Sequence, residues 1–579
     1  MADHQTSQLL LQEATGRVFW LGGKGSRGQV VHLTLCPSHL LINASSTLPR
    51  GDGNYSTFGA DGGTQGGNDN VLVISFADVI GARVQQGSSN LQVFLYAKQE
   101  PCCSCLGGAK GLRSASHLKF SFPSEADAAL WVTHILYLLR DALPPVSSPT
   151  TAIAAAPASS QPPKPKKYLV FVNPVSGKGQ GQSVWASVEA MFSHEASLEL
   201  AVVTTTHANH ARSHLSTLSL AELMSLDCIV VVGGDGLVFE VINGITSRQG
   251  PDAGVAEVLR KVALAHIGAG TGNGLCKSAL FECGEEYSAI NAAFVALRGR
   301  PRPMDLSRVE TPNSTNHAFL ILGWGLISDI DLLSESLRCM GEARLHAAAV
   351  YFILQRRMYR GRLSMHVRHR AGIVSNGDLD RSSGSDDSCG LVYTLPPLNQ
   401  ALPVDPAFVS VSVDLESPTA QSSGLSSPGG DSAIATLSPA SNNGGSSGGF
   451  SRSRTSSWKG PGGDAFSWKV IESDFLLVWV LQTSHATVSM HSGPGVRLDD
   501  GLFTIFVVEA MTRFEMLQLL LAMDTGDHIH HPRVQCFKAN AYRLEPQTPK
   551  GLFSLDGESV EYGPLQATVL PGMARVMKL

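Results

Sequence analysis

Three glycine-rich loops, each placed directly after an apolar run, are the feature that most constrains this chain. They occupy residues 173–179 (NPVSGKG), 233–236 (GGDG) and 268–274 (GAGTGNG), and they follow the runs YLVFV, DCIVVV and VALAHI. Short runs rich in Val, Ile and Leu that end in such loops predict β-strands, and helical patterns lie between them. Strands that alternate with helices predict a parallel sheet, so we expect an α/β domain with a Rossmann-like three-layer fold over residues 167–308.

The same glycines predict a phosphate site. Glycine lets the backbone turn sharply and lets its N–H groups approach an anion without a Cβ in the way. The carboxyl ends of parallel strands meet at one edge of a sheet, and the helices that follow add their positive N-terminal ends. No loop has the Walker A spacing, and the protein-kinase motifs are absent. We therefore expect a nucleotide site of another lineage, with contacts that include Gly233, Gly234, Gly236 and Gly270.

Asp235 lies between the glycines of the second loop, at the end of a predicted strand. A carboxylate in this position can accept the proton of a substrate hydroxyl, which is general-base chemistry. The alternative is structural, because an aspartate here can also cap the helix predicted to begin at Leu237. The residues around Asp235 do not decide between the catalytic role and the capping role.

Residues 15–143 predict a β-rich domain closed by one helix. Short Val-, Ile- and Leu-rich runs are separated by Gly, Ser and Asn clusters. A helical pattern that starts at Ser124 places the apolar residues Leu130, Ile135 and Leu138 around a central Trp131. This arrangement resembles a pleckstrin-homology domain. The resemblance implies docking on phosphoinositide-bearing membranes, and the alternative is a packing or protein-interaction domain. A Pro-, Ala- and Ser-rich linker is expected over 144–166.

Two further regions follow the predicted α/β domain. Residues 371–463 are dominated by Ser, Gly, Asp and Pro, so we expect a disordered insertion there. From residue 464 onward, β-branched and aromatic runs such as FLLVWVLQT and GLFTIFVVEA return. These runs predict a second, antiparallel β unit.

The motifs NPVSGKG, GGDGLVFEVING and GAGTGNGL resemble the blocks of a lipid kinase superfamily that includes diacylglycerol, ceramide and sphingosine kinases, with NAD kinase as a distant relative. The stretch Trp324–Leu363 and the segment FKANAYRLEPQTPKGLFSLDGE narrow the resemblance to sphingosine kinases. The resemblance implies a catalytic α/β domain and a lipid-binding β-sandwich formed by residues 309–370 and 464–579. It implies ATP-dependent phosphorylation of the primary hydroxyl of a sphingoid base. Mg²⁺ is implied with ATP, held largely by phosphates and water, because no dedicated set of metal ligands is evident.

The resemblance also assigns roles to single residues, and it favours Asp235 as the catalytic base. Arg338 and Arg344 are expected to hold ATP phosphates, because a guanidinium fork suits phosphate oxygens. The alternative pairs them with Glu335 and Glu342 on a helix surface. The other ATP contacts that the resemblance implies are Asn173, Gly177, Lys178, Thr205, Thr271, Gly272, Asn273, Asp556, Gly557 and Glu558.

Asp331 is the residue that bears on the lipid substrate. A sphingoid base carries a cationic amine beside its hydroxyl, whereas ceramide and diacylglycerol do not. In sphingosine kinases the second aspartate of a D-x-D pattern pairs with this amine, and Asp329 and Asp331 form that pattern here. A carboxylate beside a lipid tunnel costs free energy unless it meets a cation. The alternative is that both aspartates flank a solvated loop.

Leu326 and Ile327 are expected to line the lipid pocket. The chain departs from the family pattern at Val175, where some relatives have Arg, and at Leu326, where an aromatic residue is common. These departures leave open the nucleotide contacts and the preferred chain length of the lipid.

Composition and charge limit the partners. The net charge of -5 and the pI of about 6.4 argue against a general nucleic-acid binder. The longest apolar runs are too short to span a bilayer, and the first residues, MADHQTSQLLLQEATG, lack a secretory signal. We expect a cytoplasmic protein with free thiols that is peripherally membrane-associated, with the N-terminal domain as a candidate contact. The sequence indicates no oligomeric state. Two rival functions remain, a ceramide or diacylglycerol kinase and a catalytically silent lipid-binding scaffold.

Overall fold

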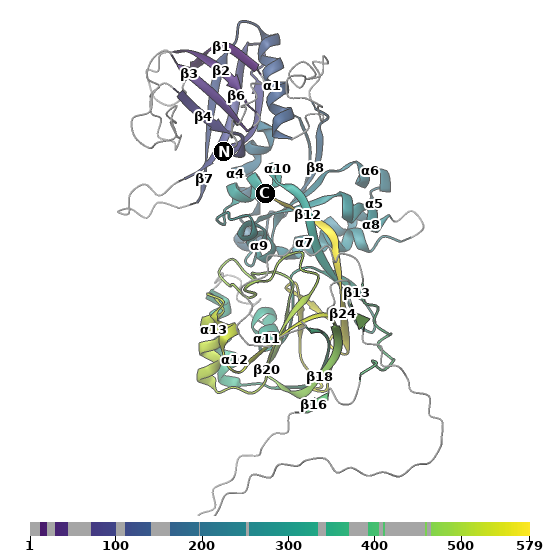
Figure 1. The fold of residues 1–579 in the computed structure, drawn as a ribbon. Helices are drawn as coiled ribbons and strands as arrows, with labels where there is room; N and C mark the ends of the chain where they lie inside the picture. Colours follow the sequence, from purple (N-terminus) through teal and green to yellow (C-terminus); the bar gives the residue numbers. More distant parts are fainter. Residues whose placement is uncertain are drawn as a thin grey trace, which may run out of the picture.

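The computed structural model describes residues 12–19, 29–36, 38–44, 71–99, 111–140, 163–195, 197–249, 254–333, 343–369, 392–404, 409–411, 458–459 and 465–579. Three units follow one another along the long axis of the molecule (Figure 1). An N-terminal sheet lies at one end, an α/β unit lies in the middle, and a β-rich unit with three flanking helices lies at the other end.

The N-terminal unit is a seven-stranded antiparallel sheet in the order β4-β3-β2-β1-β7-β6-β5, covered by helix α1. Ser124 caps α1 by accepting a hydrogen bond from the Asp127 N–H, so the predicted start of this helix is confirmed. Trp131 is buried against the sheet together with Ile135 and Leu138, as predicted, whereas Leu130 is 39% exposed. The elements are β1 (Gln12–Phe19), β2 (Gln29–Leu35), β3 (His39–Ala44), β4 (Val71–Ser75), β5 (Val79–Val84), β6 (Asn90–Lys98), β7 (Arg113–Ser121) and α1 (Glu125–Leu139).

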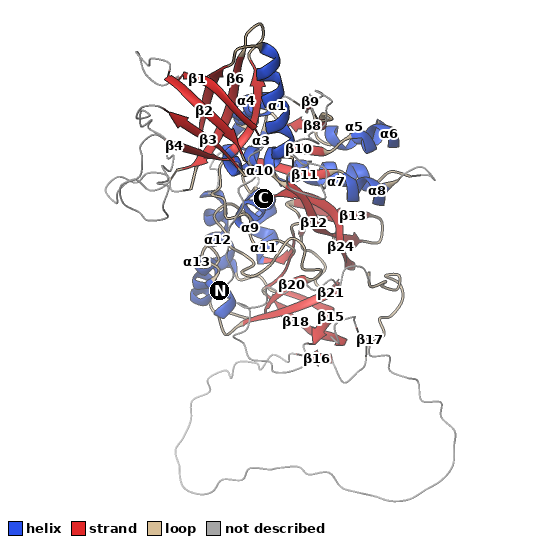
Figure 2. Cartoon of the chain, turned by 45° about the horizontal axis from the view of Figure 1, so that its top comes forward, coloured by secondary structure: helices blue, strands red, loops and turns tan. Residues whose placement is uncertain are grey.

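The middle unit is a parallel sheet in the order β9-β8-β10-β11, with helices on both faces (Figure 2). Helices α4 and α10 pack on one face and α5, α7 and α8 on the other, each over its own apolar core, so the expected three-layer arrangement is present. The strands are β8 (Lys166–Val172), β9 (Leu198–Thr204), β10 (Cys228–Gly233) and β11 (Ala263–Gly268). The helices are α3 (Ser176–Gly179), α4 (Gly181–His194), α5 (His210–Thr217), α6 (Leu220–Ser225), α7 (Asp235–Thr246), α8 (Val255–Lys261), α9 (Gly274–Glu282) and α10 (Ala289–Arg298).

The third unit is a β-sandwich whose long strands pair antiparallel around a core that contains Trp324, Tyr359 and Phe475. Helices α11, α12 and α13 lie along one side of it. The strands are β13 (Thr315–Ala318), β14 (Ile321–Gly325), β15 (Tyr359–His369), β18 (Ala465–Phe475), β19 (Leu477–Leu481), β20 (Phe503–Val508), β21 (Val534–Pro546), β22 (Phe553–Leu555) and β23 (Glu558–Val560). The helices are α11 (Leu326–Leu333), α12 (Ala343–Gln355) and α13 (Arg513–Ala522).

Two long strands, β12 (Arg300–Glu310) and β24 (Leu565–Lys578), connect the sandwich to the α/β unit. They pair antiparallel along their length, from Arg300 with Lys578 to Glu310 with Gln566. One end of β24 also pairs with β21 of the sandwich, and the other pairs parallel with β11. The α/β sheet therefore takes its strand next to β11 from the far end of the sequence.

Part of the predicted disordered insertion is ordered, so that prediction is wrong for residues 392–404 and 409–411. Arg543 donates hydrogen bonds to the carbonyls of Pro396 and Gln400, at 2.9 and 2.6 Å. The strand β16 (Val409–Val411) pairs with β18. The sequence around these residues, LVYTLPPLNQALPV, is rich in Leu, Val and Pro rather than Ser and Gly, and it can pack on the sandwich. Other parts of the insertion lie outside the described residues, as do residues 144–162 of the predicted linker.

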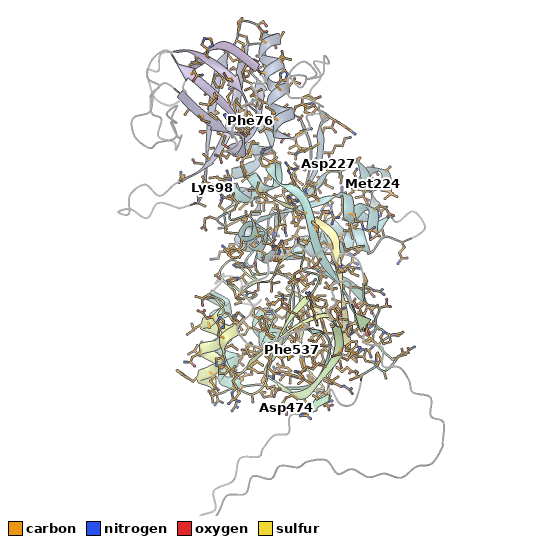
Figure 3. The ribbon with its side chains drawn as sticks, in the orientation of Figure 1. Phe76, Lys98, Met224, Asp227, Asp474 and Phe537 are labelled. Carbon is orange, nitrogen blue, oxygen red and sulfur yellow. The ribbon has the colours of Figure 1, made fainter. Side chains whose placement is uncertain are left out.

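The N-terminal sheet is packed directly on the α/β unit. Its residues Ile80 and Tyr96 belong to the same buried core as the α/β helices. Arg113 of β7 reaches across to Glu285, with 2.8 Å between Nη2 and Oε1, and its guanidinium lies 3.7 Å from the ring centre of Phe294. Both charged side chains are at least 95% buried, since Arg113 is 5% and Glu285 is 1% exposed. Lys98, labelled at this junction in Figure 3, also pairs with Glu285.

Candidate active site

The three glycine loops touch one another at the carboxyl ends of β8, β10 and β11. A Cβ on Gly177 would lie 2.7 Å from the carbonyl oxygen of Ala269, and one on Gly270 would lie 2.5 Å from the Cα of Gly234. Gly177 also has φ +61°, a conformation that side chains disfavour. The loops can therefore approach this closely only as glycines, and together they form one continuous backbone surface.

Asp235 is the first residue of α7, and its carboxylate is buried against the third loop. Its Oδ2 accepts the N–H of Gly274 at 2.8 Å, and its Oδ1 accepts the N–H of Leu275 at 3.1 Å. The predicted structural alternative, a cap on Asp235's own helix, is not what is seen, because Gly234 is the N-cap of α7. Asp235 instead caps α9, whose N-terminal N–H groups stabilise its negative charge. The N-terminus of α9 is thus occupied by this carboxylate and is not a free phosphate site.

The third loop is held closed by its own side chain. The Asn273 side chain accepts the Gly270 N–H at 2.8 Å and donates to the Gly270 carbonyl at 2.7 Å, and Asn273 itself has φ +59°. Its amide is therefore engaged in shaping the loop. Gly272 lies close to the carboxylate, since a Cβ there would be 3.2 Å from Oδ2 of Asp235. Thr271 lies between Gly270 and Gly272 in this loop and is half-buried.

The turn between β22 and β23 brings the sandwich to the second loop. A Cβ on Gly236 would lie 2.8 Å from Oε1 of Glu558, so this carboxylate lies at the start of α7. Asp556 points elsewhere: its carboxylate accepts the N–H groups of Phe319, Leu320 and Ile321 at 2.9–3.0 Å. Burial raises the pKa of Asp556 to about 7, against the lowering effect of these three donors. Of these two predicted carboxylates, Glu558 reaches the loops and Asp556 anchors the turn.

A segment that the sequence did not single out also reaches the third loop. It follows β19, and its Val488 N–H donates to the Gly272 carbonyl at 3.0 Å. The backbone N–H of His485 donates to the Ser278 Oγ of α9 at 3.0 Å, and the His485 carbonyl accepts from the same hydroxyl at 3.5 Å. The carbonyl of Ala486 would be 2.7 Å from a Cβ on Gly274. The sequence TSHATVS has neither a motif nor a regular period, so nothing in it predicted this contact.

The two aspartates of α11 have different surroundings. Asp329 is buried, and it accepts a short hydrogen bond from the Tyr359 hydroxyl. Burial raises the pKa of Asp329, and the Tyr359 bond opposes that effect. Asp331 is half-buried and accepts a short hydrogen bond from Ser554 of β22. Both lie on a helix, so the predicted alternative of a solvated loop does not hold.

The remaining predicted residues are placed as follows. Leu326 and Ile327 are buried in the apolar cluster between the sandwich and α12–α13. Thr205 is buried, and its N–H donates to the Val172 carbonyl at 2.8 Å. Residues Asn173, Gly233, Gly234 and Gly236 lie on the loops, Gly557 lies in the turn with φ +85°, and Lys178 is exposed. Arg338 lies outside the described residues, and for Arg344 only its position in α12 is described.

No group of three or more His, Cys, Asp or Glu side chains among the described residues could hold a metal ion. In the same described part of the chain, no helix is long and apolar enough to cross a membrane.

The α/β unit with its three joined glycine loops and the β-sandwich that completes it each match a known protein family. Residues 167–309 match the diacylglycerol kinase catalytic domain, and residues 467–578 match the YegS C-terminal NAD kinase beta sandwich-like domain. Two domains of the chain are therefore similar to those of the diacylglycerol kinase-like lipid kinase superfamily.

Within the superfamily, the similarity extends to sphingosine kinases. The chain is 29% identical over 518 residues to sphingosine kinase 2 of Homo sapiens, covering 78% of this chain and 76% of that protein. It is 25% identical over 406 residues to sphingosine kinase 1 of Arabidopsis thaliana, covering 69% of this chain and 70% of that protein. It is 28% identical over 419 residues to sphingosine kinase 1 of Homo sapiens, covering 71% of this chain and 90% of that protein.

Proposed function

We propose that this chain transfers the γ-phosphoryl group of ATP to the primary hydroxyl of sphingosine or a related sphingoid base. The observation that carries the proposal is the placement of Asp235. Its buried carboxylate lies where the three glycine loops and Glu558 of the sandwich turn meet. Similarity to sphingosine kinases along most of the chain supports the same conclusion.

Phosphoryl transfer depends on positioning and on neutralising charge rather than on covalent catalysis. The backbone N–H groups of the joined loops are suited to hold the phosphates. Asp235 is the proposed general base, because two N–H donors hold its carboxylate in one orientation beside the loops. Glu558, and the arginines at 338 and 344, are proposed to contact the nucleotide. Mg²⁺ bound to the phosphates supplies further charge neutralisation.

We propose that Asp331 recognises the substrate by pairing with the amine of the sphingoid base. Asp331 is half-buried on α11 and accepts a hydrogen bond from Ser554. Asp331→Asn is expected to raise the KM for sphingosine about thirtyfold, because a truncated ion pair of this kind costs about 2 kcal/mol. Steady-state kinetics at saturating ATP would measure this. The matched control is ceramide, which lacks the amine, so any turnover of ceramide should not fall in the variant. An unchanged KM for sphingosine would remove Asp331 from this role.

We propose membrane contact through the outer face of α12 and α13, which lie side by side at the edge of the sandwich (Figures 1 and 2). Leu354 of α12 is 63% exposed, and Phe514 and Leu521 of α13 are 68% and 62% exposed. Asp331 lies on the adjacent helix α11. A bilayer at this face would therefore present the lipid substrate close to Asp331. Among the residues of the N-terminal unit whose side chains the structure describes, Leu130 is the one exposed large apolar residue. The pleckstrin-homology assignment of that unit, with a domain over 15–143, also remains a proposal.

Leu354→Ser combined with Leu521→Ser is expected to weaken binding to vesicles of phosphatidylcholine and phosphatidylserine about tenfold, because two side chains no longer enter the bilayer. Vesicle sedimentation would measure the loss. Turnover of sphingosine in detergent micelles should not change, and Val202→Ser, exposed on β9, serves as the control. Equal vesicle binding by all forms would contradict the proposal.

A lipid panel tests the proposed function directly. Transfer of labelled phosphate from ATP with Mg²⁺ should be measured side by side for sphingosine, phytosphingosine, ceramide and diacylglycerol. Labelling confined to the two free bases is expected. Labelling of ceramide or diacylglycerol would support the rival lipid kinases, and labelling of none would support the catalytically silent scaffold.

A further inference from the structure

A buried histidine lies directly behind the proposed catalytic aspartate. His266 is on β11, just before the third glycine loop, and its side chain is 1% exposed. Its Nδ1 lies 3.7 Å from Oδ1 of Asp235 and has no hydrogen-bond partner. Buried polar atoms without a partner are uncommon, so this one calls for a physical reason.

The other ring nitrogen determines which tautomer is present. Nε2 of His266 lies 3.0 Å from the carbonyl oxygen of Gly233, in the turn that leads to Asp235. A carbonyl can only accept, so Nε2 carries the hydrogen. Burial lowers the pKa of His266, against the raising effect of Asp235, and this favours the neutral ring. Nδ1 therefore presents a lone pair to the carboxylate.

A lone pair and a carboxylate cannot form a hydrogen bond unless a proton lies between them. The other partners of the Asp235 carboxylate, the N–H groups of Gly274 and Leu275, are donors and stay in place in either state. While the ring of His266 stays neutral, the contact between Asp235 and His266 therefore becomes favourable when Asp235 has taken up one proton. A general base reaches that state during the reaction.

We propose that His266 is a positioning residue that acts through Asp235, by accepting a hydrogen bond from its carboxyl group after that group has taken the substrate proton. The inference rests on the proposed phosphoryl transfer. In that step the substrate O–H bond breaks, and its electron pair forms the new bond to the γ-phosphorus. The bond from the γ-phosphorus to the bridging oxygen breaks, and its electrons leave with ADP. The proton goes to Asp235, and the new O–H donates to Nδ1 of His266.

Three other acidic groups lie near Asp235 and His266. Cys276 of α9 lies beside the ring at a small internal cavity, and burial raises the pKa of its thiol to about 12, so it is neutral. The nearest carboxyl groups of the sandwich are Asp556, whose pKa is raised by burial and by Asp235, and Glu558 at the start of α7. No lysine or arginine among the described residues forms an ion pair with Asp235 or His266.

Two substitutions separate this role from a merely structural one. His266→Gln can keep an N–H donor for the Gly233 carbonyl but has no group at the position of Nδ1. His266→Asn does the reverse, because its shorter amide lies near Asp235 and loses the Gly233 bond. Both variants and the unmodified protein should be compared by kcat and KM for ATP and sphingosine across pH, with thermal unfolding as a check on folding.

His266→Gln is expected to lower kcat about tenfold with both KM values unchanged, the scale of one lost hydrogen bond. Because that bond stabilises the protonated pair, its loss should also move the acid limb of the kcat profile about one pH unit lower. A structural role alone predicts that His266→Gln behaves like the unmodified protein and that His266→Asn is the damaged form. That outcome would overturn the proposal.

A spectroscopic test covers the case in which neither variant folds. The unmodified protein is labelled with ¹⁵N-histidine. At pH values above the acid limb of the kcat profile, Nδ1 of His266 should be unprotonated and without a hydrogen bond. At pH values below that limb, it should accept a hydrogen bond. Its resonance is identified as the one that changes in Asp235→Asn. A ring protonated on both nitrogens above the acid limb would overturn the proposal. Failure of the proposed function would be distinct, because the unmodified protein would then phosphorylate no sphingoid base.

Discussion

Replacement of Asp235 with asparagine is expected to lower kcat for sphingosine phosphorylation by about two to four orders of magnitude, the range associated with loss of a general base. The amide is nearly the same size as the carboxylate but cannot take up the substrate proton. Binding of ATP should persist, because the glycine loops hold their shape through backbone contacts and through Asn273. Initial rates at saturating sphingosine and ATP would measure the loss.

Stability is the necessary control for this variant. The carboxylate accepts two N–H groups at the start of α9, and an asparagine amide can accept only one of them. We expect a loss of about 1–3 kcal/mol in the free energy of unfolding, the cost of one unsatisfied buried donor. Thermal unfolding and nucleotide binding would show whether the fold persists. A folded Asp235→Asn protein with near-normal kcat would place the proton acceptor elsewhere.

Replacement of Arg113 with methionine is expected to lower the free energy of unfolding by about 3 kcal/mol. Removing one partner of a buried ion pair leaves an uncompensated charge, which typically costs about 3–5 kcal/mol. The lower end applies here, because Lys98 and Asn291 remain beside Glu285, each at 3.0 Å. Chemical denaturation followed by circular dichroism would measure the loss. The contact joins the N-terminal sheet to the α/β unit, so the two units should lose stability together.

Lys98→Met provides a matched control, because Lys98 pairs with the same carboxylate but its side chain is 40% exposed. An exposed pair contributes about 0–1 kcal/mol, so this variant should unfold close to the unmodified protein. Adding Glu285→Gln to Arg113→Met should recover part of the loss, since the buried charge is then absent. An Arg113→Met protein as stable as Lys98→Met would show that the junction does not depend on this ion pair.

The sequence predicted the parts of the site that local chemistry encodes. Glycine loops after apolar runs identified the carboxyl edge of the parallel sheet, and Ser124 marked the start of α1, because such local preferences are set by neighbouring residues. The role of Asp235 as a cap on α9 could not be predicted, since Gly274 and Leu275 are far from it in sequence. The same holds for Asp556, which bonds to N–H groups of residues 319–321.

Long-range contacts account for the other differences. The segment around Val488 carries no motif, yet it contacts Gly272 because the sandwich is folded against α9. Residues 392–404 were expected to be disordered from the composition of the insertion as a whole, which hid a short apolar stretch anchored by Arg543. The packing of the N-terminal sheet depends on Arg113 and Glu285, which look like ordinary surface charges in the sequence.

The pairing of β24 with β11 has a consequence for protein synthesis. Residues 575–576 complete the edge of the α/β sheet beside residues 263–264, so the nucleotide unit cannot be finished while the ribosome is still translating the sandwich. Until then the backbone of β11 presents an unpaired edge to other nascent chains. The N-terminal sheet has no such requirement, because all seven of its strands precede Ser124. We therefore expect folding during synthesis to yield the N-terminal sheet first, and the α/β unit and the sandwich to be completed together once β24 has been synthesised.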